Sequence, residues 1–300
     1  MKRFRHIRSR RGVVLVAVLW TIALLSALAM AASTSFRSFA GLLAIDRDRV
    51  QAEALIDAGI EVGADLLIKY GGRPLLATET RFALPVGAGR VRLSDELGRI
   101  DINKAPAETL ASLLGAVGAP DAEAVAQAIV RWRDAGEASA VKRAPNSDPS
   151  ERARHFEQTF TNVDQLTQIP AVPADYARSI APFVTVFGAE TVNAATAPIE
   201  VLRLLPQMTE ARIERLMEAR AAGALEPEAC DQILGPASRY AKPAARSIGR
   251  LEIVVALADG FAEEAEAVIV VVPKDSEPYR ILAFRLSSRP TAYGAYPRGE

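Results

Sequence analysis

An uncharged apolar run over residues 13–32, VVLVAVLWTIALLSALAMAA, limits the possible folds of this chain more than any other feature. A helix rises about 1.5 Å per residue, so a helix over this run would be about 30 Å long and would match the hydrocarbon core of a bilayer. Six basic residues precede the run and the first acid is Asp46, which predicts a single span with a cytoplasmic N-terminus. The side chains expected to face lipid include Val13, Leu15, Trp20, Leu24 and Leu28.

The start of this run allows three interpretations. Ala29-Met30-Ala31 offers the small-residue site of a secretory signal peptide, and a plain single-span anchor accounts for the length of the run. Neither accounts for the junction Arg10-Arg11-Gly12-Val13, where a basic leader ends in Gly at the first apolar residue. This junction resembles the type IV pilin and pseudopilin class, whose prepilin peptidase cuts after such a Gly and methylates the new N-terminus. The resemblance implies cleavage after Gly12 and N-methylation of Val13.

Ala17 departs from the pattern of most of that class, whose members carry Glu at the fifth mature position. Within the class, this absence resembles the minor pseudopilin K family of type II secretion, also called general secretion pathway protein K. The segment AEALIDAGIEVGADLLIKY, residues 52–70, is similar to the corresponding stretch of that family.

The helical pattern continues beyond the apolar run until Gly71-Gly72, and its outer half is amphipathic. An apolar stripe recurs there at three- and four-residue steps, so this half needs a sheet or a partner to cover it. Packing against partner helices, as well as the chain's own sheet, is expected at Leu55, Ile56, Val62 and Leu66. The predicted stripe consists of Leu55, Ala58, Gly59, Val62, Leu66 and Tyr70.

Alternating apolar residues predict strands on both sides of a central helical region. Residues 81–94 are expected to form a hairpin that turns at Gly87-Ala88-Gly89. The segments LEIVVAL, AEAVIVVV and YRILAFRL predict a three-stranded antiparallel meander near the C-terminus. The expected fold is therefore α+β, with a pilin-like long helix on a small antiparallel sheet and a large all-α insertion. The expected parts are a leader (1–12), the long helix (13–72), the sheet (73–103 and 246–300), and two helical modules (104–190 and 191–245).

The central region contains an imperfect repeat. Residues 105–110, APAETL, recur as APIEVL at 197–202, with Pro and Glu suited to a first helical turn. An Asn precedes each copy, at Asn103 and Asn193, although the Asn spacing differs by two residues. The two modules resemble helix-hairpin-helix or sterile-alpha-motif-like units. Related hairpins bind DNA backbone through glycine-rich turns. Here the turn at residues 115–118 keeps two glycines, the turns at 168–171 and 205–208 keep none, and no basic cluster accompanies them.

Composition adds two constraints. The chain has 36 basic and 36 acidic residues, and loss of the leader would leave 30 against 36, which argues against nonspecific nucleic-acid binding. Cys230 is the only cysteine, so an intramolecular disulfide and a cysteine-based zinc site are excluded. No cofactor is required by any motif, and His155 is the one histidine outside the leader, so no enzyme is expected.

The polar stretch from Asp134 to Glu151 has no periodicity and is expected to be a loop. Members of the pseudopilin K family hold calcium in their helical domain, so this loop is a candidate calcium site, although its spacing is not that of an EF-hand. The candidate ligands are Asp134, Glu137, Asn146 and Asp148.

The leader, the missing Glu, the long helix, the double helical insertion opened by DELGRIDINKAP and VNAATAP, and the closing strands together resemble the pseudopilin K family over nearly the whole chain. The resemblance implies a non-enzymatic protein of the bacterial inner membrane, with its C-terminal domain in the periplasm. It also implies a role in capping the pseudopilus tip with minor pseudopilins I and J. Two alternatives remain: a membrane-tethered helix-hairpin-helix protein that binds DNA, and a minor pilin of a type IV pilus.

Overall fold

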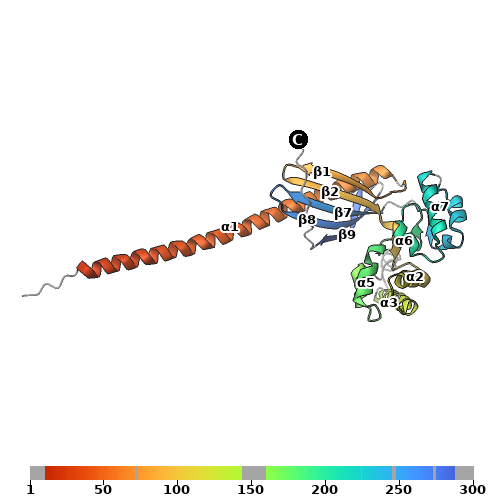
Figure 1. The fold of residues 1–300 in the computed structure, drawn as a ribbon, viewed down its shortest axis with the longest axis horizontal. Helices are drawn as coiled ribbons and strands as arrows, with labels where there is room; N and C mark the ends of the chain where they lie inside the picture. The colour runs from red at the N-terminus through yellow and green to blue at the C-terminus, as the bar shows by residue number, and fades with distance from the viewer. Residues whose placement is uncertain are drawn as a thin grey trace, which may run out of the picture.

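The long helix α1 (Arg11–Tyr70) leads into a sheet, and a group of helices lies at the far end of that sheet (Figure 1). The computed structural model of the chain describes residues 11–71, 73–143, 160–223, 225–244, 248–272 and 275–287, without the side chains of 11–14, 32–42, 44 and 135–143. Its fold is α+β, with an antiparallel sheet and several helices.

The main sheet has five strands in the order β1-β2-β7-β8-β9, and every neighbouring pair is antiparallel. The first two strands precede the helical region in the sequence and the last three follow it, so the helical region is inserted between β2 and β7. The expected meander is present at β7 to β9. The strands are β1 (Thr78–Leu84), β2 (Gly87–Asp95), β7 (Ile248–Leu257), β8 (Ala262–Val271) and β9 (Tyr279–Ser287).

The turn of the first hairpin differs from the prediction. Leu84 pairs with Gly87, so Pro85 and Val86 form the connection, and Gly87-Ala88-Gly89 begins β2. A Cβ atom on Gly89 would lie 2.4 Å from the Phe82 ring. This glycine is therefore needed for a close side-chain approach across the strands, and Pro85 provides a fixed φ for the turn.

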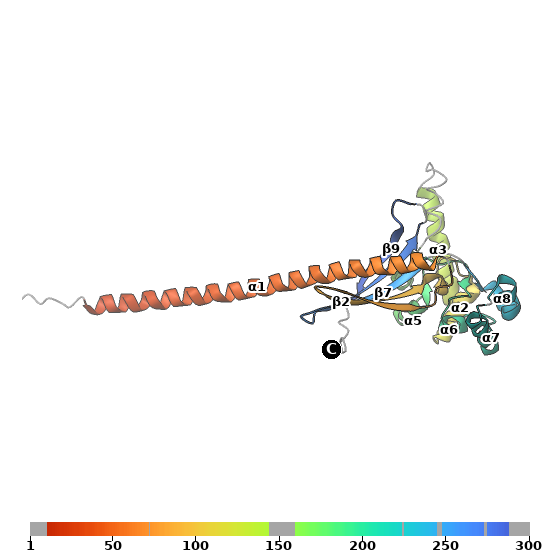
Figure 2. The same cartoon turned by 90° about the horizontal axis from the view of Figure 1, so that it is seen from above.

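The C-terminal half of α1 packs over β2, β7 and β8 (Figure 2). Its buried stripe is rotated relative to the prediction, because Ala58, Val62 and Leu66 are only half-buried. Gly59 and Gly63 face the sheet, where an added Cβ would lie 2.8 Å from Ile253 and 2.5 Å from Leu251. The helix ends at Tyr70, and Gly71 follows it with a φ of 58°, which suits the left-handed C-terminal cap. The buried stripe consists of Ala52, Leu55, Ile56, Gly59, Ile60, Gly63, Ala64 and Leu67.

The inserted region consists of two modules of similar construction. In each, a short strand leads into helices and a second short strand pairs with the first in parallel. The first module contains β3 (Ile100–Asp101), α2 (Ala107–Ala116), α3 (Ala122–Arg143), η2 (Val163–Gln168), α5 (Ala174–Ile180), η3 (Ala181–Phe183) and β4 (Val184–Thr185). The second contains β5 (Val192–Asn193), α6 (Ile199–Arg203), α7 (Glu210–Ala221), α8 (Pro227–Leu234), η4 (Gly235–Arg239) and β6 (Ala241–Lys242).

The sequence repeat lies at the same place in both modules, but its register differs from the prediction. The amide of Ala105 donates to the carbonyl of Asp101 at 2.7 Å, and the amide of Ala197 donates to that of Asn193 at 2.9 Å. Asp101, and not Asn103, is therefore the equivalent of Asn193. Each turn leads to a proline that precedes the helix, Pro106 before α2 and Pro198 before α6.

A half-buried arginine supports each of these turns from a later helix. Arg133 on α3 donates to the carbonyl of Ala105 at 2.7 Å. Arg220 on α7 donates to the carbonyls of Ala194 and Ala197 at 2.6 and 2.8 Å. The sheet with α1 and the inserted modules form two separate hydrophobic cores. Polar contacts between these two parts are described below.

Candidate functional site

A buried glutamate lies where the sheet meets the inserted modules. Glu96 begins the 3₁₀-helix η1 (Glu96–Gly98), directly after β2, and its side chain is 0% exposed. Arg250 on β7 donates to both of its carboxylate oxygens at 2.6 Å, and the Thr185 hydroxyl on β4 also donates to it. One carboxylate therefore binds a strand of the main sheet and a strand of the first module.

The same ion network extends across the outer strands. Arg250 also pairs with Glu266 on β8, and Arg285 on β9 donates to Glu266 at 2.9 Å. Arg285 in turn donates to Asp164 on η2 at 3.2 Å. Burial alone would lower the pKa of Arg250, but its hydrogen bonds and attraction to Glu96, with Glu266, outweigh burial and raise this pKa. The carboxylates of Glu96 and Glu266 therefore hold this guanidinium in its charged form.

Asp95 makes a second connection, to the other module. Its carboxylate accepts from the Asn193 amide at 2.7 Å and from the Thr196 hydroxyl at 2.5 Å. The amide of Leu97 donates to its other oxygen at 3.0 Å and caps η1. Burial raises the pKa of Asp95 despite these hydrogen bonds. Two consecutive acids thus attach one module each to the end of β2.

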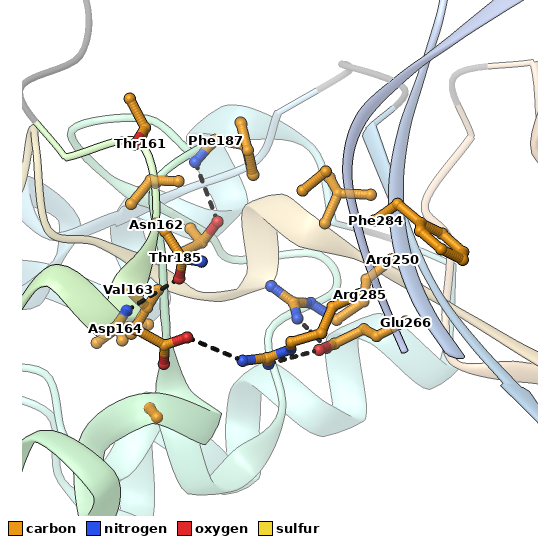
Figure 3. Close-up of a pocket in the computed structure, with 15 residues that line it drawn as sticks. Thr161, Asn162, Val163, Asp164, Thr185, Phe187, Arg250, Glu266, Phe284 and Arg285 are labelled. Atoms are coloured by element: carbon orange, nitrogen blue, oxygen red, sulfur yellow. Dashed lines mark hydrogen bonds and ion pairs between the residues drawn. The ribbon is translucent and has the colours of Figure 1, made fainter. Parts of the chain in front are cut away.

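A pocket of about 140 Å³ lies beside this junction, between η2 and β4 on one side and β8 and β9 on the other. Figure 3 shows Arg250, Glu266 and Arg285 on one side of the strands, with Phe284 directed to the opposite side. The charged groups on its wall already pair with one another. The arrangement therefore suits a rigid attachment of the inserted modules to the sheet.

Of these junction residues, the sequence pattern singles out only Asn193, as part of the repeat. Asp95 and Glu96 open the motif DELGRIDINKAP, which marks the entry to the insertion. A pair of acids at the point where a buried strand leaves a sheet is a usable signal, because a buried carboxylate needs a charged or hydrogen-bonding partner. The partner Arg250 lies 154 residues further along the chain, and local sequence pattern does not indicate it.

The structure places the predicted N-terminal residues on an isolated part of α1. The side chains of Leu15, Ala17, Trp20, Leu24 and Leu28 are all exposed there. The backbones of Gly12 and Val13 lie in the first turn of α1, while the side chain of Val13 and leader residues 1–10 lie outside the described residues. Within the part of the chain that the structure describes, no helix is both long enough and apolar enough to cross a membrane.

The residues expected to contact partner helices divide into two pairs. Leu55 and Ile56 are 0% and 1% exposed, because they lie on the face of α1 that packs against the chain's own sheet. They are therefore not available to a partner in this structure. Val62 and Leu66 are half-buried at the side of α1, and their contact with a partner remains a prediction.

The structure does not bring the predicted calcium ligands together in one described site. The helix α3 continues to Arg143, so the expected loop does not begin at Asp134, which lies exposed on this helix. Glu137 lies on α3 without a described side chain, and Asn146 and Asp148 lie outside the described residues. Over those residues, no group of three or more His, Cys, Asp or Glu side chains is placed to hold a metal ion.

Comparison with solved structures finds a similar fold in one chain of the GspK–GspI–GspJ complex from the type 2 secretion system of enterotoxigenic Escherichia coli. The match covers 81% of this chain and 98% of that chain, with a TM-score of 0.55 and 12% sequence identity. At this identity the similarity is one of fold. No family model and no curated protein matches the sequence.

Proposed function

We propose that this chain is a minor pseudopilin of a type II protein secretion system, a non-enzymatic part that caps the pseudopilus tip and helps to initiate its assembly. The observation that carries the proposal is the fold, in which a long helix packs on an antiparallel sheet with a helical region inserted between β2 and β7. The similarity to one chain of a pseudopilin complex covers 98% of that chain. It therefore extends over the whole fold and is not limited to one shared element.

The position of the inserted modules supports a place at the tip. They lie at the end of the sheet opposite the free half of α1 (Figure 1). A subunit whose α1 enters a filament would thus direct this bulk along the filament axis, where it would block a further subunit. Such a subunit suits the start of an assembly better than its shaft. The two modules are proposed to be of the helix-hairpin-helix or sterile-alpha-motif-like type.

Several finer parts of the proposal rest on sequence alone. They are processing by prepilin peptidase after Gly12, methylation of Val13, and localisation at the bacterial inner membrane with the C-terminal domain in the periplasm. The exposed apolar side chains on the first half of α1, Leu15 to Met30, are consistent with an apolar environment supplied by other helices or by lipid. Binding of calcium near α3 is part of this proposal.

The test is purification of the tagged full chain from its own cells, with and without prepilin peptidase. We expect the minor pseudopilins I and J of the same system to co-purify, and the mature chain to begin at Val13. Deletion of the gene is expected to leave secreted substrates in the periplasm, and the wild-type gene to restore export. Normal export without the chain, together with no pseudopilin in the purified complex, would overturn the proposal.

A further inference from the structure

The last strand of the sheet carries an apolar row that no described element covers. Its three side chains lie opposite residues of β8 that are buried beneath α1, and opposite residues of an antiparallel pair share one face of the sheet. The row therefore faces the side of the sheet on which α1 lies, yet its members are 40 to 49% exposed. This β9 row consists of Ile281, Phe284 and Leu286, and the β8 partners are Ile269, Ala267 and Ala265.

An acidic row on α1 borders the β9 row. The Tyr279 hydroxyl on β9 donates to Glu61 at 2.7 Å, which shows the side of α1 that faces β9. Asp57 and Glu53 precede Glu61 at four-residue steps and are exposed like it. Among the described residues, none of these three acids forms an ion pair with a Lys or Arg side chain, so their charge is available to a partner. We call Glu53, Asp57 and Glu61 the acidic row.

The spacing between these rows fits a second helix. α1 is centred over β7, with β2 and β8 on its two sides. Neighbouring strands are about 4.8 Å apart, so β9 lies about 9 to 10 Å from β7 across the sheet. Packed helices have interaxial distances of about 8 to 10 Å. A helix on the β9 row would therefore lie directly beside α1.

A strand fits this surface less well than a helix. A strand added to the free edge of β9 would extend the sheet and leave the β9 row uncovered. The edge is also irregular, because Val268 pairs with Ala283 and Ile269 with Ile281, which leaves Leu282 as an extra residue on β9. Such bulges interrupt the ladder that a new strand requires.

We propose that the β9 row and the acidic row together bind an amphipathic helix of another subunit. Its apolar stripe would cover the β9 row, and Lys or Arg residues beside that stripe would face the acidic row. That the subunit is another pseudopilin rests on the proposed function, whereas the chemistry of the helix follows from this surface alone.

The test is photocrosslinking in the full chain, expressed in its own cells with the other minor pseudopilins. A benzoylphenylalanine replaces Phe284, and in a matched control it replaces Trp132, which is 39% exposed on α3. We expect the adduct at position 284 to join a helical segment of another pseudopilin that carries Lys or Arg, with much less adduct at position 132. No adduct, an adduct within the same chain, an adduct to lipid or to a strand, or equal yields at both positions would overturn the inference.

Two substitutions extend the test. Phe284→Asp and Asp57→Lys should each lower the yield of co-purified pseudopilin by at least tenfold, and Glu214→Lys on the exposed face of α7 should leave it unchanged. Folding is checked by circular dichroism, since all three positions are exposed or half-exposed. If the wild-type complex forms and the two variants bind normally, this inference fails and the proposed function stands. If the wild-type chain forms no complex, the proposed function fails.

Discussion

Asp101 and Asn193 occupy equivalent turns in the two inserted modules, yet their side chains are paired differently. The Asn193 amide donates to Asp95 and to the carbonyl of Ala244, and its oxygen accepts from two backbone amides. Asp101 accepts from the amide of Asn103 at 2.7 Å, but its Oδ2 has no hydrogen-bond partner among the described residues. Burial raises the pKa of Asp101 to about 6, although the Asn103 amide and the Lys104 charge oppose this.

This shift makes stability depend on pH. The folded-state pKa of Asp101 lies above its unfolded value, so the folded protein binds this proton more tightly. Below about pH 4 the carboxyl is protonated in both states and does not lower the stability of the folded protein. As the pH rises from about 4 to about 6, burial of the charge makes the folded protein progressively less stable. Asp101→Asn should therefore raise the free energy of unfolding by about 1 to 2 kcal/mol at pH 7.5, and by much less at pH 4.

Urea unfolding at both pH values measures this difference. Asp231→Asn, at an exposed position on α8, is the control and should change stability little. A loss of stability for Asp101→Asn at pH 7.5 would contradict the argument that the charged carboxyl is the costly form.

At the scale of elements, the contact between α1 and the sheet depends on two glycines one helical turn apart. Gly59 and Gly63 let the backbone of α1 approach Ile253 and Leu251 on β7 more closely than a side chain would allow. Glycine costs roughly 1 kcal/mol relative to alanine in a helix, so this helix keeps two unfavourable residues because they are needed for packing.

Gly63→Ala should consequently lower the free energy of unfolding by about 1 to 3 kcal/mol, because its Cβ would lie 2.5 Å from Leu251. The matched control is Gly115→Ala on α2, where the nearest atom lies 3.9 Å from the new Cβ. This control should be neutral or stabilising by up to about 1 kcal/mol. Thermal unfolding compares the two variants, and equal effects would rule out close packing as the reason for Gly63.

Glycines also show which features of the helices and strands the sequence predicts and which it does not. Period-two alternation located β7, β8 and β9, and Gly71 located the end of α1, because each signal is local. The turn at Pro85-Val86 and the exact buried stripe of α1 were not predicted, because Gly89 resembles a turn residue and Gly63 adds no side chain to an apolar pattern. In both places a glycine is required because another part of the chain packs closely against it. The local sequence pattern does not reveal such a contact.

At the scale of the whole molecule, we expect the attachment of the inserted modules to the sheet to depend most on Glu96. It is fully buried, and it binds Arg250 of the sheet and Thr185 of the first module. Removal of one partner from a buried ion pair leaves the other charge uncompensated, which costs about 3 to 5 kcal/mol in proteins studied to date. Glu266 would still face Arg250 and offset part of that cost.

Glu96→Gln should thus destabilise the chain by about 2 to 4 kcal/mol and should separate the unfolding of the inserted modules from that of the sheet. Differential scanning calorimetry should show one transition for the wild type and two for this variant. Glu210→Gln, which removes an exposed ion pair with Arg203, should change stability by less than about 1 kcal/mol. A single transition at an unchanged temperature for Glu96→Gln would show that the cores are joined by other contacts.

The junction also marks the limit of sequence reasoning about the candidate site. The double insertion and its repeat were visible in APAETL and APIEVL, because both copies serve the same local turn. The choice of Asn103 as the repeated residue was wrong, since Asp and Asn perform the same backbone task and Asp101 matches Asn193 in the structure. Arg250 and Glu266 could not be assigned, because their buried partners come from parts of the chain that meet only after folding.

The two points at which the inserted region leaves and rejoins the sheet lie directly opposite each other, at Asp95 and Gly249 of neighbouring strands. Chain ends held this close would suit almost any folded unit whose own termini are adjacent. The position is therefore a natural graft site: a fluorescent or enzymatic reporter could replace the helices there without rerouting a strand. By the same geometry, gene rearrangement could add or exchange such a unit during evolution while the helix and sheet kept their pattern.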